Sequence, residues 1–218
     1  MLTYAIGDIH GCADHLRQLL ADIEEHRASR PRKLVFLGDY IDRGPDSAGV
    51  IEVLRALQGS EAQDVVCLMG NHEDLMINAF HTPGERLNWL MNGGNKALMS
   101  FGIDGPEKLP GDVVRWVKRL PTAHEDALRY YVHAGFRPRA PAPDPDDHAR
   151  LWIREPFLSE DYDFGKLVVH GHTPLVLGEP DVRRHRVNLD TACVFGGHLT
   201  AAVFTDERPH PVEFLQVG

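Results

Sequence analysis

Three apolar segments near the start of the chain end in the same kind of loop. The segments 2–6, 34–37 and 65–69 run into the sequences GDIHG, GDYIDRG and GNHE. An aspartate that leaves a buried strand into a glycine turn is held in place by the strand, and the glycine lets backbone and substrate approach closely. Each loop therefore presents oxygen or imidazole groups at a strand end. Asp39, in the second loop, is the candidate for a ligand shared by two metal ions.

The segments between these loops have helical periodicity. Residues 14–25 and 46–57 each place apolar side chains on one side and charged or polar ones on the other. The order strand, helix, strand, helix, strand makes the three strands parallel when the crossovers are right-handed. Their carboxyl ends then lie at one edge of a sheet. The side chains expected to converge there are Asp8, His10, Asp39 and Asn71.

The middle of the chain changes character. Residues 73–120 have helical spacing punctuated by glycine and proline, which predicts a helical cap over one side of the sheet. The cap could serve substrate choice or packing alone. Residues 137–147 contain too many prolines for a helix or a central strand, so we expect a surface loop there.

Further strands are predicted in the last part of the chain. Those at 127–132 and 167–169 run into HAG and HGHTP, so that two more strands end in histidine and glycine. Short strands are also predicted at 186–190, 199–205 and 212–217, and we expect these three to form a second sheet packed against the first.

Length and composition set the class of protein. A chain of 218 residues with 43% hydrophobic and 25% charged residues is typical of a globular protein, and we expect one domain over residues 1–218. The net charge of −9 disfavours a broad nucleic-acid or anionic-membrane surface. No long apolar run or signal-type start is present, which indicates a cytoplasmic protein. Cys12, Cys67 and Cys193 are far apart in sequence, so we expect reduced thiols rather than a disulfide framework or a CxxC site.

Carboxylate, imidazole and amide groups without thiolates suit Mn²⁺, Fe²⁺, Zn²⁺ or Co²⁺. We expect two divalent ions, with Mn²⁺ ahead of Fe, Zn, Co or Ni. The proposed ligands are Asp8 and His10 for one ion, Asn71, His133 and His172 for the other, and Asp39 shared by both. Paired ions about 3.5 to 4 Å apart generate hydroxide near neutral pH and clamp the oxygens of an in-line phosphoryl transfer. A bridging hydroxide is therefore the expected nucleophile.

Other groups in the same loops fit the remaining steps of phosphoryl transfer. Arg43 can offer a pair of donors to non-bridging phosphate oxygens. His72 can protonate the departing alkoxide, and Asp42 can orient that imidazole and raise its pKa. A single Asp in a Gly-Asp turn, or a lone histidine at a strand end, is usually only a turn, cap or buried structural residue. Four or five such loops at separate strand ends are poorly explained in that way.

These motifs resemble the signature sequences of the PPP-type phosphoprotein phosphatases, which belong to the calcineurin-like metallophosphoesterases. The resemblance rests on residues 7–11, 38–44, 70–73, 133–135 and 171–173 in that order. Residues 89–94, 151–155 and 189–197 also look like the bacterial and phage branch, the lambda-phosphatase type. The resemblance implies an α/β fold of two packed mixed sheets flanked by helices, with a dinuclear metal site at the carboxyl ends of the strands.

The resemblance also implies roles for individual residues. Asp8, His10 and Asp39 would hold the first metal ion, and Asp39, Asn71, His133 and His172 the second. Arg43 and Arg154 would bind phosphate, and His72 would be the general acid, paired with Asp42. An ordinary surface ion pair is the alternative for Arg154. Ala192 stands where this branch more usually has glycine after Asp-Thr. This difference puts the resemblance of the local turn in question, but it does not affect the metal centre.

The leading functional hypothesis is a metal-dependent phosphatase that acts on phosphoserine or phosphothreonine in proteins or peptides, with phosphotyrosine and small phosphoesters as further substrates. The main alternative is a symmetrical hydrolase of dinucleoside tetraphosphates such as diadenosine tetraphosphate, which relatives with the same metal motifs perform. A non-catalytic phosphate-binding module would have lost a ligand or His72, and none is missing. A DNA nuclease is disfavoured by the acidic charge and by the Asp42-Arg43 pair.

Overall fold

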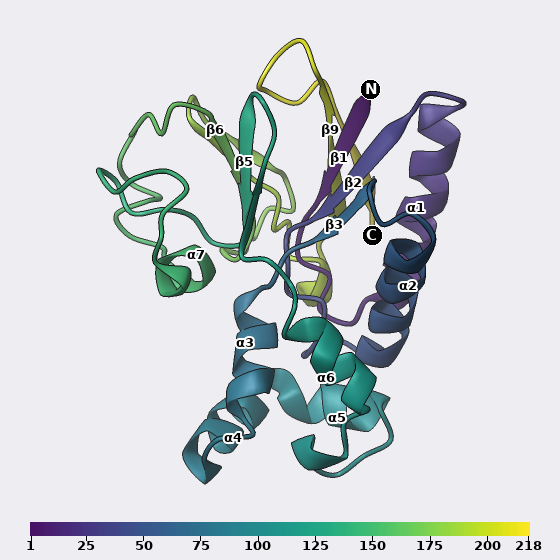
Figure 1. Cartoon of the computed structure of the whole chain (residues 1–218). Coiled ribbons are helices and arrows are strands. Elements are labelled where there is room, and N and C mark those ends of the chain that lie inside the picture. Colours follow the sequence, from purple (N-terminus) through teal and green to yellow (C-terminus); the bar gives the residue numbers. More distant parts are fainter.

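The computed structural model describes residues 1–218, and its first sheet begins as the periodicity predicts (Figure 1). Strands β1 (Leu2–Ile6), β2 (Arg32–Phe36) and β3 (Val65–Cys67) pair in parallel. Helices α1 (Ala13–Arg27) and α2 (Ser47–Ser60) connect them and cover one face of this sheet. The loops that follow the three strands therefore lie at one edge.

Two strands from the end of the chain complete this sheet. Strand β9 (Leu199–Thr205) pairs antiparallel with β1, and β10 (Glu213–Val217) pairs with β9, so that the order is β10-β9-β1-β2-β3. The prediction that these two segments join the second sheet was wrong. Strand β9 is apolar on both faces and buried, so it is stable inside a sheet with both faces covered, and the free edge of β1 accepts it.

The second sheet has the order β4-β5-β6-β8-β7. Its strands are β4 (Ala123–Glu125), β5 (Arg129–Val132), β6 (Leu167–His170), β7 (Asp181–Val182) and β8 (Arg186–Asn188). Strands β5, β6 and β8 are parallel, and the two edge strands are antiparallel to their neighbours. The parallel strands bring the loops after β5 and β6, which carry the predicted ligands His133 and His172, to one edge.

The alternation of side chains in β1 shows how the two sheets are joined. Ala5 lies opposite Val35 of β2 and Ala202 of β9, and all three face the second sheet, where Tyr131 and Val169 cover them. Residues of β1 on either side of Ala5 point the other way, toward α1 and α2. This packing establishes two mixed sheets with helices on the outer face of the first, as the predicted fold requires.

The outer face of the second sheet has a thinner cover. Irregular chain lies over it, with Phe136 and Phe157 packed on Tyr130 and Val168, while helix α7 (Asp147–Trp152) lies near the lower ends of the strands in Figure 1. The proline-rich residues 137–147 form a loop as predicted, up to the first residue of α7.

The predicted helices of residues 73–120 are present. They are α3 (Asn71–Asn78), α4 (Pro83–Trp89), a π-helical turn η1 (Leu90–Gly94), α5 (Asn95–Ser100), a 3₁₀ turn η2 (Pro106–Lys108) and α6 (Gly111–Val117). They gather beyond the carboxyl ends of the first-sheet strands rather than over a face (Figure 1). Their apolar side chains, such as Trp89 and Val117, are continuous with the core under α1 and α2. Across the whole chain, no helix combines the length and apolarity that crossing a membrane requires.

Candidate active site and metal centre

The six predicted ligands come together where the strands of both sheets end. All six are buried, and they are Asp8, His10, Asp39, Asn71, His133 and His172. Close approach of their loops depends on glycine: a Cβ on Gly70 would lie 2.2 Å from Asp39 Oδ1, and one on Gly171 would lie 2.0 Å from Asp8 Oδ1. The glycines of the motifs therefore make room for the carboxylates.

Asp39 lies at the centre of the cluster. Its Oδ2 is 3.4 Å from His10 Nε2, and its Oδ1 is 3.4 Å from His133 Nε2. The backbone N–H of His72 donates to Oδ1 at 3.0 Å. Asp39 itself has a positive φ of 54°, which turns its side chain out of the strand direction toward both groups of ligands. One carboxylate thus faces histidines on two sides, as a bridging ligand must.

Asn71 joins the histidines of the second sheet to the first. Its Oδ1 lies 2.8 Å from His133 Nε2 and 2.9 Å from His172 Nδ1. On the other side of the ring, His133 Nδ1 lies 3.0 Å from the Leu37 carbonyl, and His10 Nδ1 lies 2.8 Å from the Ile41 carbonyl. In each ring Nδ1 carries the proton and donates it in a hydrogen bond to the carbonyl oxygen. The lone pair on Nε2 is therefore available to a metal ion.

Burial shifts the pKa values of the carboxylates and of the imidazoles in this cluster in opposite directions. Burial raises the pKa of Asp39 to about 7. Burial also raises the pKa of Asp8 well above its usual range, and the nearby Asp190 and Asp39 carboxylates add to this effect. The imidazoles shift in the opposite direction, because burial lowers the pKa of His10 and His133 to about 3. Crowded carboxylates beside neutral imidazoles are a donor set that divalent cations complete. The residues present therefore fit a metal centre.

The ligand atoms of the cluster include two sets of three that lie close together. Asp8, Asp39 and His133 place their ligand atoms within 4.8 Å of one another, and so do His10, Asp39 and His72. Asp39 belongs to both groups, as expected for the shared ligand. Asp8 lies in one group with His133, which reaches Asp39 across the junction between the two sheets.

The predicted acid and its partner form a buried pair. His72 Nδ1 lies 2.7 Å from Asp42 Oδ2, so the carboxylate orients the ring as expected. The expected rise in the pKa of His72 is not found. Burial lowers this pKa well below its usual value, and the neighbouring His10 and Arg43 act in the same direction. On the side away from Asp42, His72 Nε2 lies 4.0 Å from Asp39 Oδ2.

Arg43 and Arg154 line a cavity of about 270 Å³ together with His72 and Asn71. Arg43 is half-buried and its Nη1 donates to His10 Nε2 at 2.6 Å. Arg154 is exposed and comes from the segment after α7, so the two guanidinium groups enter the cavity from opposite halves of the molecule. This places both predicted phosphate-binding residues beside the ligand cluster.

Three residues support the site without having been assigned a role from sequence. Glu73 accepts hydrogen bonds from the backbone N–H groups of Asp39 and Tyr40, at 2.9 Å each, and so holds the loop of the shared ligand. Trp89 Nε1 donates to Asp42 at 2.9 Å. Asp190 is buried close enough to Asp8 to raise the pKa of that carboxyl. Glu73 and Trp89 lie within residues 70–73 and 89–94, two of the motifs that carry the family resemblance. Their position in these motifs is the sequence signal that could have identified them.

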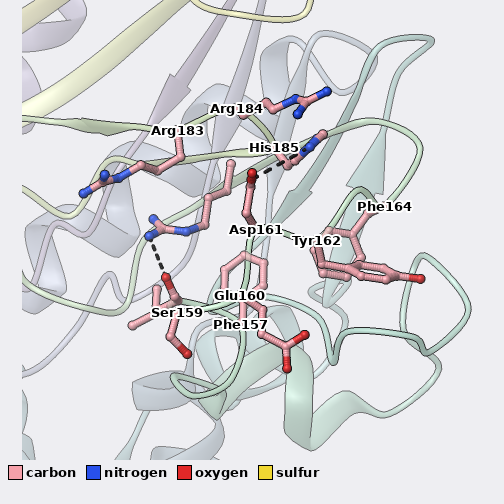
Figure 2. Close-up of a pocket in the computed structure, with 11 residues that line it drawn as sticks. Phe157, Ser159, Glu160, Asp161, Tyr162, Phe164, Arg183, Arg184 and His185 are labelled. Carbon is pink, nitrogen blue, oxygen red and sulfur yellow. Dashed lines mark hydrogen bonds and ion pairs between the residues drawn. The ribbon is translucent and has the colours of Figure 1, made fainter.

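A second cavity, of about 400 Å³, lies between residues 157–164 and 183–186 (Figure 2). Two of its basic groups have acceptors close by: His185 lies 3.8 Å from Asp161, and Arg186 donates to the Leu158 carbonyl at 3.0 Å. None of the predicted site residues lines it. The ligand cluster is therefore the candidate active site.

Comparison with known proteins finds relatives and structures that match most of this chain. The chain is 28% identical over 250 residues to the asymmetrical bis(5′-nucleosyl)-tetraphosphatase PrpE of Oceanobacillus iheyensis, covering 98% of this chain and 90% of that protein. It is 31% identical over 209 residues to serine/threonine-protein phosphatase 1 of Salmonella typhimurium, covering 92% and 90%. The fold matches a crystal structure described as a putative diadenosine tetraphosphatase, with a TM-score of 0.70 and 24% identity, over 99% of this chain and 92% of that one.

The sequence pattern of one phosphoesterase family extends over nearly the whole chain. It matches residues 1–200, a range that holds all six predicted ligands as well as His72, Asp42, Arg43 and Arg154. Because the match includes every strand-end loop from which the site is built, this chain belongs to the calcineurin-like phosphoesterase family.

Proposed function

We propose that this metallophosphoesterase is a phosphoprotein phosphatase of the lambda-phosphatase type, hydrolysing phosphoserine and phosphothreonine. One observation carries the choice: Arg43, Arg154 and His72 share an open cavity of only about 270 Å³ beside the ligand cluster. Cavities that enclose a whole small-molecule ligand usually have about 300 to 1,000 Å³. A phosphoryl group on a short side chain fits this space, while the rest of a peptide stays on the surface.

The residues divide the work of phosphate monoester hydrolysis. Arg43 and Arg154 bind the non-bridging oxygens with charged hydrogen bonds and set the phosphorus in line with the leaving oxygen. Trp89 donates to Asp42, Asp42 holds the His72 ring, and His72 donates a proton to the departing alkoxide. A bound phosphate dianion brings negative charge next to His72 and favours its protonated form, against the effect of burial.

The metal ions are assigned to the six ligands. When bound, two divalent ions supply positive charge to the phosphoryl oxygens and activate water as a nucleophile near neutral pH. We propose Mn²⁺ as the native ion, on the basis of a donor set of carboxylate, amide and imidazole groups. We also propose that the partners are phosphorylated proteins or peptides rather than nucleic acid or membranes, because of the acidic net charge of −9, and that the protein acts in the cytoplasm.

Hydrolysis of a dinucleoside tetraphosphate is the second candidate. It is favoured by Trp152 and Phe195, two aromatic side chains that line the same cavity as Arg43 and Arg154 and that offer faces for a nucleobase to stack on. The similarity to a bis(5′-nucleosyl)-tetraphosphatase over 98% of the chain supports it as well. The polyphosphate of such a substrate would occupy the cavity and its second nucleoside would lie outside.

The deciding experiment measures kcat/KM for both substrates with one preparation. Metal-stripped protein is restored with Mn²⁺ and given a phosphoserine peptide and diadenosine tetraphosphate in parallel. A higher kcat/KM for the peptide is the expected result, and a higher value for the dinucleotide would replace the proposal with the second candidate. Arg154→Ala should raise KM for the preferred substrate, whereas Arg184→Ala, an exposed arginine outside this cavity, should leave it unchanged.

A further inference from the structure

Cys12, His15 and Cys193 lie together although they come from opposite ends of the chain. Each offers one ligand atom, and these three atoms lie within 4.8 Å of one another. Cys12 immediately precedes α1, His15 is in the first turn of that helix, and Cys193 begins the 3₁₀ turn η3 (Cys193–Phe195). None of the three belongs to the predicted ligand set of the catalytic centre.

The surroundings of this cluster suit an ion that enters from solvent. Both cysteines are free thiols and are buried, with exposed fractions of 8% for Cys12 and 6% for Cys193. Cys12 Sγ approaches the His10 carbonyl at 3.8 Å, and the two thiols interact with each other. His15 is half-buried and forms the outer side of the cluster. The sulfurs are thus shielded, while the imidazole borders the surface.

Two thiolates and one imidazole are a ligand set that prefers Zn²⁺ over harder cations. Zinc–sulfur bonds of about 2.3 Å and zinc–nitrogen bonds of about 2.0 Å in a tetrahedron place the ligand atoms roughly 3.5 to 3.8 Å apart. Atoms already within 4.8 Å reach this spacing through small side-chain rotations. We propose that Cys12, His15 and Cys193 bind one Zn²⁺ ion, with water from the solvent-facing side as the fourth ligand.

An ion at this position would connect two segments that border the phosphate cavity. Cys12 lies two residues after the predicted ligand His10, and Cys193 lies two residues before Phe195. The Phe195 ring in turn lies 5.7 Å from the guanidinium carbon of Arg43. Binding therefore ties the start of α1 to the loop that packs against a phosphate-binding arginine. The position of the zinc ion allows it to influence how Arg43 is held.

Cobalt absorption separates this site from the catalytic centre. The six ligands predicted for catalysis contain no sulfur, so a thiolate-to-cobalt charge-transfer band in the near ultraviolet reports only on Cys12 and Cys193. The reduced full-length protein is titrated with Co²⁺ beyond three equivalents. We expect the band to appear, to disappear on addition of Zn²⁺, and to be lost in Cys193→Ser. Cys67→Ser is the matched control, since Cys67 is a buried thiol of β3 outside the cluster, and it should keep the band.

A second variant keeps the test decisive if loss of a buried thiol disturbs folding. His15→Ala changes a half-buried side chain, and we expect it to weaken Co²⁺ binding at the band-forming site at least tenfold while the far-ultraviolet circular dichroism stays unchanged. Absence of the band in the reduced wild-type protein would overturn the proposal. So would a band that survives in a folded Cys193→Ser variant, or an unchanged Co²⁺ affinity in His15→Ala.

Discussion

Asp42 Oδ2 lies 2.7 Å from His72 Nδ1, and both side chains are almost fully buried. A histidine held in this way presents its other nitrogen in one direction only, toward the cavity that also contains Arg43 and Arg154. The pair therefore joins the loop after β2 to the start of α3, and it places the proposed proton donor beside the two arginines that are proposed to bind phosphate.

Replacing His72 with asparagine tests the role of the acid. His72→Asn should keep the metal content and lower kcat by about 10²- to 10⁴-fold for a phosphoserine peptide, because its alkoxide leaves poorly without a proton. For p-nitrophenyl phosphate, whose leaving group is stable as an anion, the loss should be much smaller. The two kcat values are measured at saturating substrate. An equal loss for both substrates would contradict the general-acid role.

Replacing Asp39 tests the shared ligand. Asp39→Asn removes the carboxylate that lies 3.4 Å from both His10 and His133, and we expect the variant to bind fewer metal ions than the wild type. Metal content after dialysis, measured by elemental analysis, gives the answer. Asp112→Asn, an exposed carboxylate of α6, is the control and should bind as the wild type does. Two ions retained in Asp39→Asn would exclude this residue as the bridge.

The turn at Ala192 predicts a stabilising substitution. Ala192 has φ 60° and ψ 38°, a left-handed conformation that costs residues with a Cβ about 1 to 2 kcal/mol. The turn that glycine more usually forms is therefore made here by alanine. Ala192→Gly should raise the free energy of unfolding by about 0.5 to 1 kcal/mol after the greater freedom of the unfolded glycine chain is subtracted.

The matched control for this substitution has the opposite sign. Ala56→Gly, at an exposed position inside α2, should lower the free energy of unfolding by about 0.5 to 1 kcal/mol, because the residue is in an ordinary helical conformation. Denaturant unfolding of the three proteins provides the comparison. A loss of stability in Ala192→Gly would show that the alanine methyl contributes more through packing than the backbone costs.

The loop of residues 137–147 predicts a dependence of stability on pH. Burial by itself would raise the pKa of Asp144, but hydrogen bonds from the Arg137 guanidinium and from backbone N–H groups lower it to about 2. The ordinary pKa of this group is 3.8, so the carboxylate form stabilises the fold above that pH. This contribution should decline below about pH 4 and vanish as the pH falls through 2.

Unfolding by denaturant at several pH values checks this prediction. Asp144→Asn should be less stable than the wild type at pH 7, and the difference should shrink as the pH is lowered from 5 to 2. Asp163→Asn serves as the control because Asp163 is exposed and far less enclosed than Asp144. A difference between Asp144→Asn and the wild type that stays constant over this range would show that the ion pair with Arg137 does not control the titration.

Local sequence determined the strands and helices whose formation depends on residues close together in the chain. The strands before Asp8, Asp39 and Asn71 and the helices between them follow from apolar periodicity and from the handedness of crossovers. The membership of the last strands could not be predicted in the same way. Strand β9 pairs with β1, which lies almost at the other end of the sequence. The hydrogen bonds between two such strands do not change the pattern of apolar and polar residues in either segment, so this pattern does not predict the pairing.

The same distinction holds in the site and at the thiols. Sequence alone determined which side chains end the strands, and so which six residues are proposed as ligands, because glycine and the chemical type of the next residue are visible in each motif. Only the tertiary structure decided that Asp8 groups with His133, that Trp89 donates to Asp42 and that Cys12 lies near Cys193. These contacts depend on how two sheets and their loops pack, and packing between segments far apart in the chain is set by shape and burial rather than by spacing.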